Sequence, residues 1–294
     1  MAKTYHESAP AKINLSLRVT GRDPQSGYHL LDMVNAKIAL IDKLIVTIAE
    51  NGDDPIYDSF KVTGKYTSAA SGEDLSANNI VWKTIEKFRE AFGVKDCISV
   101  ELDKLIPVGA GLGGGSSDAA SMLKVLCKHY FNGQLSEKIF SLALSLGADV
   151  PYFLADNSWQ RVQGFGEILN QLPLSHPACK LRDKLIALVI PGFSVVTKDS
   201  FLKFKELGFE FSASDVCDHN WKLGVNDLLQ ASFAAQELFE PFYFELRKVV
   251  PEADIFMSGS GSCLYTFDER LYRSEQFLTC VQKLGGQVLI VGFI

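Results

Sequence analysis

The chain has 294 residues, of which 47% are hydrophobic and 22% charged, a composition typical of a water-soluble globular protein large enough for two lobes. Its formal net charge is −6, so we expect no broad basic surface for nucleic acid or for an anionic membrane. No apolar run reaches the roughly 18 residues of a membrane-spanning helix, and the polar first residues contain no signal core. The expected location is therefore cytoplasmic.

Strands are expected to dominate the first stretch of the chain. Apolar and polar residues alternate over residues 13–19, which is the period-two pattern of a half-buried strand. A turn is predicted at residues 21–27. Further strands are predicted at residues 38–40 and 44–48, with the charged pair 42–43 as a break between them.

The next stretch combines a strand with two helices. Residues 79–92 are predicted to be helical because their apolar side chains recur on one face. Residues 98–102 alternate as a strand does, and residues 119–126 repeat at helical spacing. Ser116 or Ser117 is placed to cap the start of this second helix.

A glycine-rich run lies between that strand and that helix. Five of the seven residues 109–115 are glycines, which lets several backbone N–H groups approach an anion without a Cβ in the way. The N-terminus of the following helix favours a polyphosphate. The run is not a Walker loop, since no Gly-Lys-Ser/Thr closes it, and a flexible surface loop is the alternative. We expect Gly114→Val to block the phosphates and to spare the fold.

The second half of the chain is predicted to form another α+β lobe, with the domain boundary near residue 160, so that the two domains are residues 1–160 and 161–294. A helix at residues 137–146 is expected to end at Gly147. Strand and turn follow at residues 158–172. The remaining helices are predicted at residues 199–206, 227–239, 242–249 and 270–283, and the remaining strands at 185–190, 254–257, 263–267 and 287–292.

A second glycine cluster, residues 257–263 (MSGSGSC), lies between two of these strands. A tight hairpin turn explains it. Together with the first glycine run, it also suggests a cleft to which both lobes contribute small, backbone-rich surfaces that close over a phosphate and a substrate.

Two charged residues near strand and helix ends are candidates for chemistry. Lys12 lies on the face of its strand opposite the apolar one, where a solvated lysine is the alternative. Asp149 follows a helix and precedes Val-Pro, where it could simply accept from loop N–H groups. A carboxylate paired with a lysine beside a phosphate loop suits phosphoryl transfer, because it can accept the proton of a hydroxyl nucleophile.

The motifs of the chain resemble those of the GHMP small-molecule kinase superfamily, and the resemblance covers nearly the whole sequence. It rests on residues 10–15 (PAKINL), 27–29 (GYH), 111–120 (GLGGGSSDAA), 147–151 (GADVP), 164–169 (GFGEIL) and 258–263 (SGSGSC). The Gly-Tyr-His element and the triple glycine before Ser-Ser point to the diphosphocytidyl kinases of the superfamily, whose substrate is a small cytidine diphosphate. The resemblance implies a two-lobed α+β fold with a ribosomal-protein-S5-like N-terminal lobe, a ferredoxin-like C-terminal lobe and the active site in the cleft between them.

The resemblance also implies roles for individual residues. Lys12 and Asp149 would serve the substrate hydroxyl, and Asn14 would orient the sugar alcohol. Tyr28 and Phe201 would sandwich the cytosine, which His29 would read through hydrogen bonds, with Thr197, Gly259 and Gly261 also at the substrate. The ATP-binding residues would be Pro107, Val108, Gly109, Ala110, Gly111, Leu112, Gly113, Gly114, Gly115, Ser116, Ser117, Asn79, Ile80 and Lys104. ATP would be the co-substrate with Mg²⁺, for which Ser117 is the candidate protein ligand, and the protein would be a monomer or a weak homodimer.

The sequence also departs from the superfamily pattern. Ala110 replaces a usual glycine, which is tolerable if its φ is negative, and Phe256 stands where arginine is usual. Neither change removes a proposed catalytic group. The alternatives are a superfamily kinase for another small alcohol, of homoserine or mevalonate type, and a ligand-sensing protein that keeps the fold without turnover.

Overall fold

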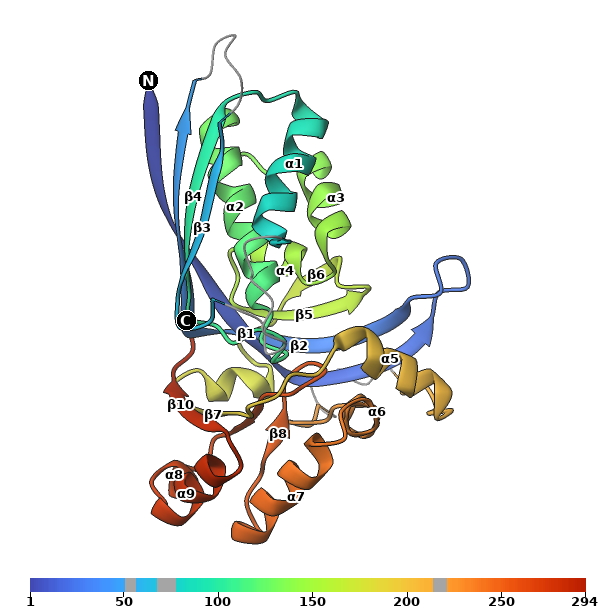
Figure 1. Ribbon diagram of the computed structural model, residues 1–294. Coiled ribbons are helices and arrows are strands. Elements are labelled where there is room, and N and C mark those ends of the chain that lie inside the picture. The colour runs from blue at the N-terminus through green and yellow to red at the C-terminus, as the bar shows by residue number, and fades with distance from the viewer. Residues whose placement is uncertain (51–56, 68–77, 214–220) are drawn as a thin grey trace. The chain divides into compact units, whose positions relative to one another are not determined.

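The computed structural model describes residues 1–50, 57–67, 78–213 and 221–294 (Figure 1). Its internal contacts divide the chain into two compact units, neither of which is one continuous segment. Unit 1 consists of Met1–Ala11, Leu40–Val108 and Gly113–Asp156, and unit 2 consists of Lys12–Ala39, Gly109–Leu112 and Asn157–Ile294. The domain boundary near residue 160 stays a prediction.

The sheet of unit 1 is built on β2 (His29–Ala49), which like β1 (Ala2–Arg22) passes through both units. Its second half pairs antiparallel with β4 (Cys97–Lys104), and β3 (Ser59–Gly64) pairs parallel with the other edge of β4. Burial alternates along β4, which confirms the predicted strand. The predicted break at residues 42–43 is wrong, because β2 continues through both residues.

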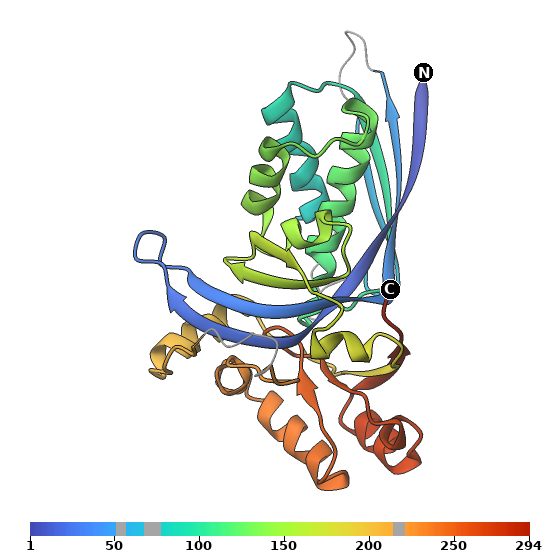
Figure 2. The same ribbon diagram turned by 180° about the vertical axis from the view of Figure 1, so that it is seen from behind.

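The helices of unit 1 lie on one face of this sheet in both ribbon views (Figures 1 and 2). They are α1 (Ile80–Phe92), α2 (Gly114–Tyr130), α3 (Glu137–Leu146) and the short α4 (Val150–Leu154). The predicted helices over residues 79–92 and 137–146 are confirmed, and Gly147 is the C-cap of α3. The capping prediction for α2 is wrong: the cap is Gly113 at φ +71°, so Ser116 and Ser117 lie inside the first turn.

Unit 2 contains a four-stranded antiparallel sheet in the order β10-β7-β9-β8. The strands are β7 (Ile186–Ile190), β8 (Phe256–Met257), β9 (Leu264–Thr266) and β10 (Gln287–Val291). Every residue of β7 is buried, as its uninterrupted apolar sequence predicts. The first half of β2 pairs with β5 (Trp159–Gly164), which pairs in turn with β6 (Ile168–Gln171), so the predicted strand and turn over 158–172 are confirmed.

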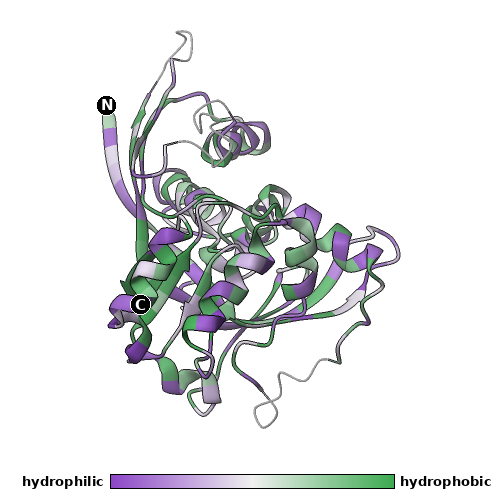
Figure 3. Ribbon diagram, turned by 60° about the horizontal axis from the view of Figure 1, so that its bottom comes forward, coloured by the Kyte–Doolittle hydropathy of each residue, from purple (hydrophilic) through white to green (hydrophobic). Residues whose placement is uncertain are grey.

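The helices of unit 2 carry polar and apolar residues along their length, as amphipathic surface helices do (Figure 3). They are the 3₁₀ helix Pro177–Leu181, α5 (Thr197–Glu206), α6 (Leu229–Ala235), α7 (Phe239–Val249), α8 (Glu269–Tyr272) and α9 (Glu275–Lys283). The one helix predicted over residues 270–283 is two, because Ser274 caps a new helix by accepting from the N–H of Phe277. Within the described ranges, no helix is long and apolar enough to cross a membrane.

Candidate active site

Lys12 is a buried residue of β1 in unit 2, with 3% of its surface exposed. Its Nζ donates a hydrogen bond to Oδ1 of Asn14 at 2.7 Å. Its backbone N–H donates to the carbonyl of Leu112, in the glycine-rich run, at 2.9 Å. The burial excludes the alternative of a solvated strand lysine, and the backbone bond attaches this part of β1 to the glycine run.

Asn14 joins Lys12 to residues that the sequence analysis did not select. Its Nδ2 donates to Oδ1 of Asn35 at 2.7 Å and to the sulfur of Met33 at 3.2 Å. Its backbone N–H donates to Oγ of Ser258 at 3.3 Å, in the second glycine cluster. The predicted substrate residue Asn14 therefore lies at the centre of a buried polar network.

The glycine run in unit 2, residues 109–112, turns its carbonyl groups into the protein. The carbonyls of these four residues accept hydrogen bonds from Val195 N–H, Cys263 N–H, Ser258 Oγ and Lys12 N–H, at 2.9–3.3 Å. Within the described part of the chain, none of the four N–H groups donates a hydrogen bond. An array of N–H groups without acceptors next to a helix N-terminus is suited to bind an anion.

The backbone conformation of this run requires glycine. Gly109, Gly111 and Gly113 have φ between +68° and +74°, a region that L side chains rarely adopt. A Cβ on Gly111 would lie 2.2 Å from the carbonyl oxygen of Ser258. Ala110 is not in this region, since Asn132 is the single non-glycine residue with positive φ in the described ranges. The alanine at this position is therefore compatible with the turn, as predicted.

The second glycine cluster forms the predicted tight turn between β8 and β9 in unit 2. Asn226 holds this turn, because its Nδ2 donates to the carbonyls of Met257 and Gly259 at 3.1 and 2.9 Å. The hydroxyls of Thr197 and Ser260 are 2.9 Å apart. With the Ser258 bond to the first glycine run, the two clusters contact each other, and Thr197 lies beside them.

His29 packs against aromatic rings in unit 2. Its ring stacks on Phe201 with centroids 5.1 Å apart and planes 21° apart, and it meets the rings of Phe204 and Phe211 edge-on. Burial first, and nearby positive charges second, lower the pKa of His29 below its ordinary value. A neutral imidazole has one donor and one acceptor nitrogen, which is what reading the edge of a pyrimidine requires.

Tyr28 is arranged differently from the predicted sandwich. Its ring is 70% exposed and meets the edge of Phe165 at a centroid distance of 6.1 Å. One face of the Phe201 ring is covered by the imidazole of His29. A cytosine that stacks on Phe201 therefore has to use the other face of that ring or displace the imidazole. The sandwich stays a prediction.

In unit 1, a buried ion triad lies beneath the start of α2. Nζ of Lys104 donates to Asp118 Oδ2 at 2.6 Å and also to Asp42 Oδ2. The other oxygen of Asp42 accepts from the N–H groups of Leu105 and Ile106 at 2.5 and 2.7 Å. The triad thus ties β2, β4 and α2 together at the point where the glycine run begins. Its lysine ammonium is hydrogen-bonded to two carboxyl groups, and the predicted contact of Lys104 with adenosine stays a prediction.

The triad holds two carboxyl groups for one lysine. Burial raises the pKa of Asp118 to about 8. The Lys104 ammonium opposes this shift, whereas the negative charge of Asp42 adds to it. The neighbouring Ser117 hydroxyl is buried and has no hydrogen-bond partner within the described residues. Ser117 is therefore an orphaned oxygen in the first turn of α2, where the sequence predicts phosphates and a metal ion.

Two other predicted nucleotide residues of unit 1, Ile80 and Lys104, lie beside the same turn. Asn79 caps α1 by accepting from the N–H of Val81 at 2.9 Å, and a Cβ on Gly115 would lie 3.7 Å from Ile80. A Cβ on Gly114 would instead lie 2.8 Å from Ile106 and 3.1 Å from Lys104 Nζ. The expectation that Gly114→Val spares the fold is therefore wrong, because the side chain would enter the core beside the triad. The contacts of Pro107, Val108 and Ser116 with ATP stay predictions.

Asp149 belongs to unit 1 and immediately precedes α4, in the turn that Gly147 begins. The turn lies beside the start of α2, since a Cβ on Gly147 would be 3.8 Å from the hydroxyl of Ser116. Asp149 is half-buried, whereas the adjoining helix α4 is wholly buried. The carboxylate therefore comes from a turn that lies next to the start of α2 in its own unit. Its pairing with Lys12, which belongs to unit 2, stays a prediction.

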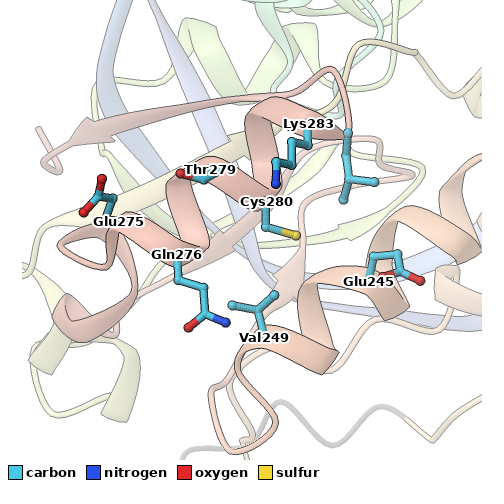
Figure 4. Close-up of a pocket in the computed structure, with 8 residues that line it drawn as sticks. Glu245, Val249, Glu275, Gln276, Thr279, Cys280 and Lys283 are labelled. Atoms are coloured by element: carbon cyan, nitrogen blue, oxygen red, sulfur yellow. The ribbon is translucent and has the colours of Figure 1, made fainter.

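The hollow between α7 and α9, about 600 Å³ in volume, contains none of the predicted site residues (Figure 4). Glu245, Cys280 and Lys283 are among the residues that line it. The predicted site residues belong instead, in unit 2, to the two glycine clusters and their surroundings and, in unit 1, to the start of α2 and the residues beside it.

The α+β architecture with two sheets and a glycine run before α2 is that of the GHMP kinases. Residues 79–157 match the family model for the GHMP kinases N terminal domain. A crystal structure of homoserine kinase from Cytophaga hutchinsonii shares the fold, with a TM-score of 0.63 at 17% identity over 99% of this chain and 95% of that one.

Full-length relatives define the family more narrowly. The 4-diphosphocytidyl-2-C-methyl-D-erythritol kinase of Francisella tularensis subsp. novicida is 32% identical, covering 96% of this chain and 93% of the relative. The enzyme of the same name from Fusobacterium nucleatum is 34% identical, covering 92% and 90%. A crystal structure of 4-(cytidine 5'-diphospho)-2C-methyl-D-erythritol kinase superposes with a TM-score of 0.67 at 26% identity, covering 98% and 99%. The chain belongs to the 4-diphosphocytidyl-2-C-methyl-D-erythritol kinase family.

Proposed function

We propose that this protein is the ATP-dependent kinase that phosphorylates the 2-hydroxyl of 4-diphosphocytidyl-2-C-methyl-D-erythritol in non-mevalonate isoprenoid precursor biosynthesis. The observation that carries the proposal is the full-length similarity to kinases of that name, at 32–34% identity. The Lys12–Asn14 pair, Asp149 and the N–H groups of residues 109–112, which donate to no acceptor in the described part of the chain, would supply the groups that the reaction needs.

Phosphoryl transfer depends mainly on positioning and on charge stabilisation, because the transition state is loose and carries charge on its oxygens. The N–H groups of residues 109–112 and the N-terminus of α2 would bind the ATP phosphates. Asp149 would accept the proton of the substrate hydroxyl as general base, and Lys12 would hold that hydroxyl and the transferred group. The hydrogen bond from Lys12 to Asn14 fixes the ammonium in one direction, which favours such a role.

Mg²⁺ commonly takes one or two protein ligands and completes its shell with phosphate oxygens and water. The unpartnered hydroxyl of Ser117, in the first turn of α2, fits that need for one protein oxygen. When bound, the ion would neutralise phosphate charge.

The cytidine part would be recognised in unit 2 by the aromatic residues around His29. A neutral His29 can pair with the edge of cytosine, and Phe201 and Tyr28 offer ring faces for stacking, worth about 1–3 kcal/mol for each base in proteins that bind single strands. Asn14, Thr197 and the turn at Gly259 and Gly261 would contact the rest of the substrate.

A substrate panel tests this function. The purified protein is assayed for ADP release with ATP, Mg²⁺ and one of four alcohols: the cytidine substrate, its uridine analogue, homoserine or mevalonate. We expect turnover with the cytidine substrate and little with the others. A preference for homoserine or mevalonate would show that the proposed substrate is wrong. If the protein binds ATP but turns over none of the alcohols, a ligand-sensing protein would be favoured.

A further inference from the structure

Asn35 is a fully buried residue in the middle of β2, with 0% of its surface exposed. In the register of β2 and β5 it lies opposite Gln160, another buried amide. Apolar residues fill most of this strand interior, so a buried asparagine requires hydrogen-bond partners for its amide.

The direction of the Asn35 amide follows from Lys12. A lysine ammonium only donates, so Asn14 must present Oδ1 to Lys12, and its Nδ2 points the other way. That Nδ2 donates to Asn35 Oδ1 at 2.7 Å, so Asn35 must present its oxygen. The Lys12 ammonium therefore fixes the orientation of two amides, first that of Asn14 and, through it, that of Asn35.

This order leaves the Asn35 Nδ2 group without a hydrogen-bond partner in the described part of the chain. A buried unpaired donor is unfavourable for folding, and a leucine of similar volume would avoid this loss. Stability therefore explains this amide poorly, and among the described residues its side chain makes a single hydrogen bond, the one that it accepts from Asn14.

We propose that Asn35 is a positioning residue, which holds the Asn14 side chain so that its oxygen faces the Lys12 ammonium. The inference rests on the proposed function, because Lys12 matters only if it serves phosphoryl transfer. Without the oxygen of Asn35, the remaining acceptor for Asn14 Nδ2 is the sulfur of Met33 at 3.2 Å, which is a weaker partner. Asn14 could then rotate, and the ammonium would lose a fixed direction.

The test compares Asn35→Leu, which removes the acceptor, with Asn35→Asp, which keeps an oxygen in the same place. Gln160→Met is the matched control, because Gln160 is a buried amide on the adjacent strand that donates to the carbonyl of Asn157 and not to this network. The measurements are kcat, KM for ATP and the thermal midpoint of each purified full-length protein.

We expect kcat of Asn35→Leu to fall about tenfold, the effect of one well-placed hydrogen bond, with KM for ATP within about twofold of the parent value. Its thermal midpoint should stay close to the parent value, because the unpaired Asn35 Nδ2 is removed while Asn14 Nδ2 loses its oxygen acceptor. Asn35→Asp should recover most of kcat although a buried carboxyl lowers its midpoint, and Gln160→Met should keep the parent kcat.

Three results would overturn the inference. The first is a parental kcat in Asn35→Leu, and the second is an equal loss of kcat in Asn35→Leu and Asn35→Asp. The third is a loss of kcat in Gln160→Met as large as that in Asn35→Leu. A parent protein without turnover on the cytidine substrate is a different result, because it refutes the proposed function and this inference with it.

Discussion

Gly111→Ala is the substitution for which the structure gives the most definite magnitude. Gly111 has φ +74°, and a Cβ there would lie 2.2 Å from the carbonyl oxygen of Ser258 and 2.9 Å from that of Gly261. Both atoms belong to the backbone of the second glycine cluster, so no side-chain rotation relieves the overlap. The two glycine clusters would have to separate.

Three contributions add to the expected loss of stability. An alanine in the left-handed region costs roughly 1–2 kcal/mol. Separating the clusters would break the bond from Ser258 Oγ to Gly111 O at 3.0 Å and the bond from Cys263 N–H to Ala110 O at 3.1 Å, each worth about 1 kcal/mol. We expect the free energy of unfolding to fall by about 3 kcal/mol, and ATP binding to weaken because the N–H groups of this run move.

Urea unfolding followed by circular dichroism measures this change, with Gly115→Ala as the control from the same glycine run. A Cβ on Gly115 would lie 3.7 Å from Ile80, an ordinary contact, and alanine is the better helix former by up to about 1 kcal/mol. The control should therefore be as stable as the parent or more so. The reasoning is refuted if Gly111→Ala unfolds within about 1 kcal/mol of the parent, which is no more than the conformational cost alone.

Three further predictions concern the ionisable groups. Asp149→Asn should keep the parental thermal midpoint and lose ~10²–10⁴-fold in kcat, since an amide cannot accept the hydroxyl proton; a near-parental kcat would contradict its role as base. The pKa of Asp118 is raised, so between about pH 4 and pH 8 the folded protein keeps the proton of Asp118 and the unfolded chain does not. The free energy of unfolding should therefore fall as pH rises through this window, by at most about 1.4 kcal/mol per pH unit. Asp118→Asn should flatten that slope in urea titrations at several pH values, and an unchanged slope would place the proton elsewhere. Because the pKa of His29 is lowered, KM for the cytidine substrate should stay constant at neutral pH and rise only in acid, below the pH range in which an ordinary histidine titrates; a rise already at neutral pH would contradict a neutral imidazole.

Local patterns predicted much of the fold. The helix over residues 79–92 and the end of α3 at Gly147 follow from periodicity and capping chemistry, and both agree with the structure. β3 was missed because Ser59–Gly64 is a short strand with only two apolar residues, Phe60 and Val62, and neither of them is fully buried. The break predicted at residues 42–43 failed for a tertiary reason: Asp42 is buried inside β2, and Lys104 and two backbone N–H groups compensate its charge.

The candidate site was predictable where one short segment carries the signal. The glycine run, Lys12 and Asn14 are recognisable from adjacent residues, and the structure joins them by hydrogen bonds. Asn35 and the Asp42–Lys104–Asp118 triad depend on the register of strands far apart in sequence, so single residues such as Asn35 give no local signal. The stacking of His29 on Phe201 depends on where α5 lies, and spacing along the chain does not specify it.

The reaction proposed for this protein is phosphoryl transfer from ATP to the 2-hydroxyl of 4-diphosphocytidyl-2-C-methyl-D-erythritol. Phosphorus NMR of the purified protein incubated with this substrate, ATP and Mg²⁺ follows both the donor and the product in one experiment. We expect a new phosphomonoester signal that grows in step with ADP, while the diphosphate signals of the cytidine substrate persist. An unchanged spectrum, or ADP accompanied by inorganic phosphate alone, would contradict it.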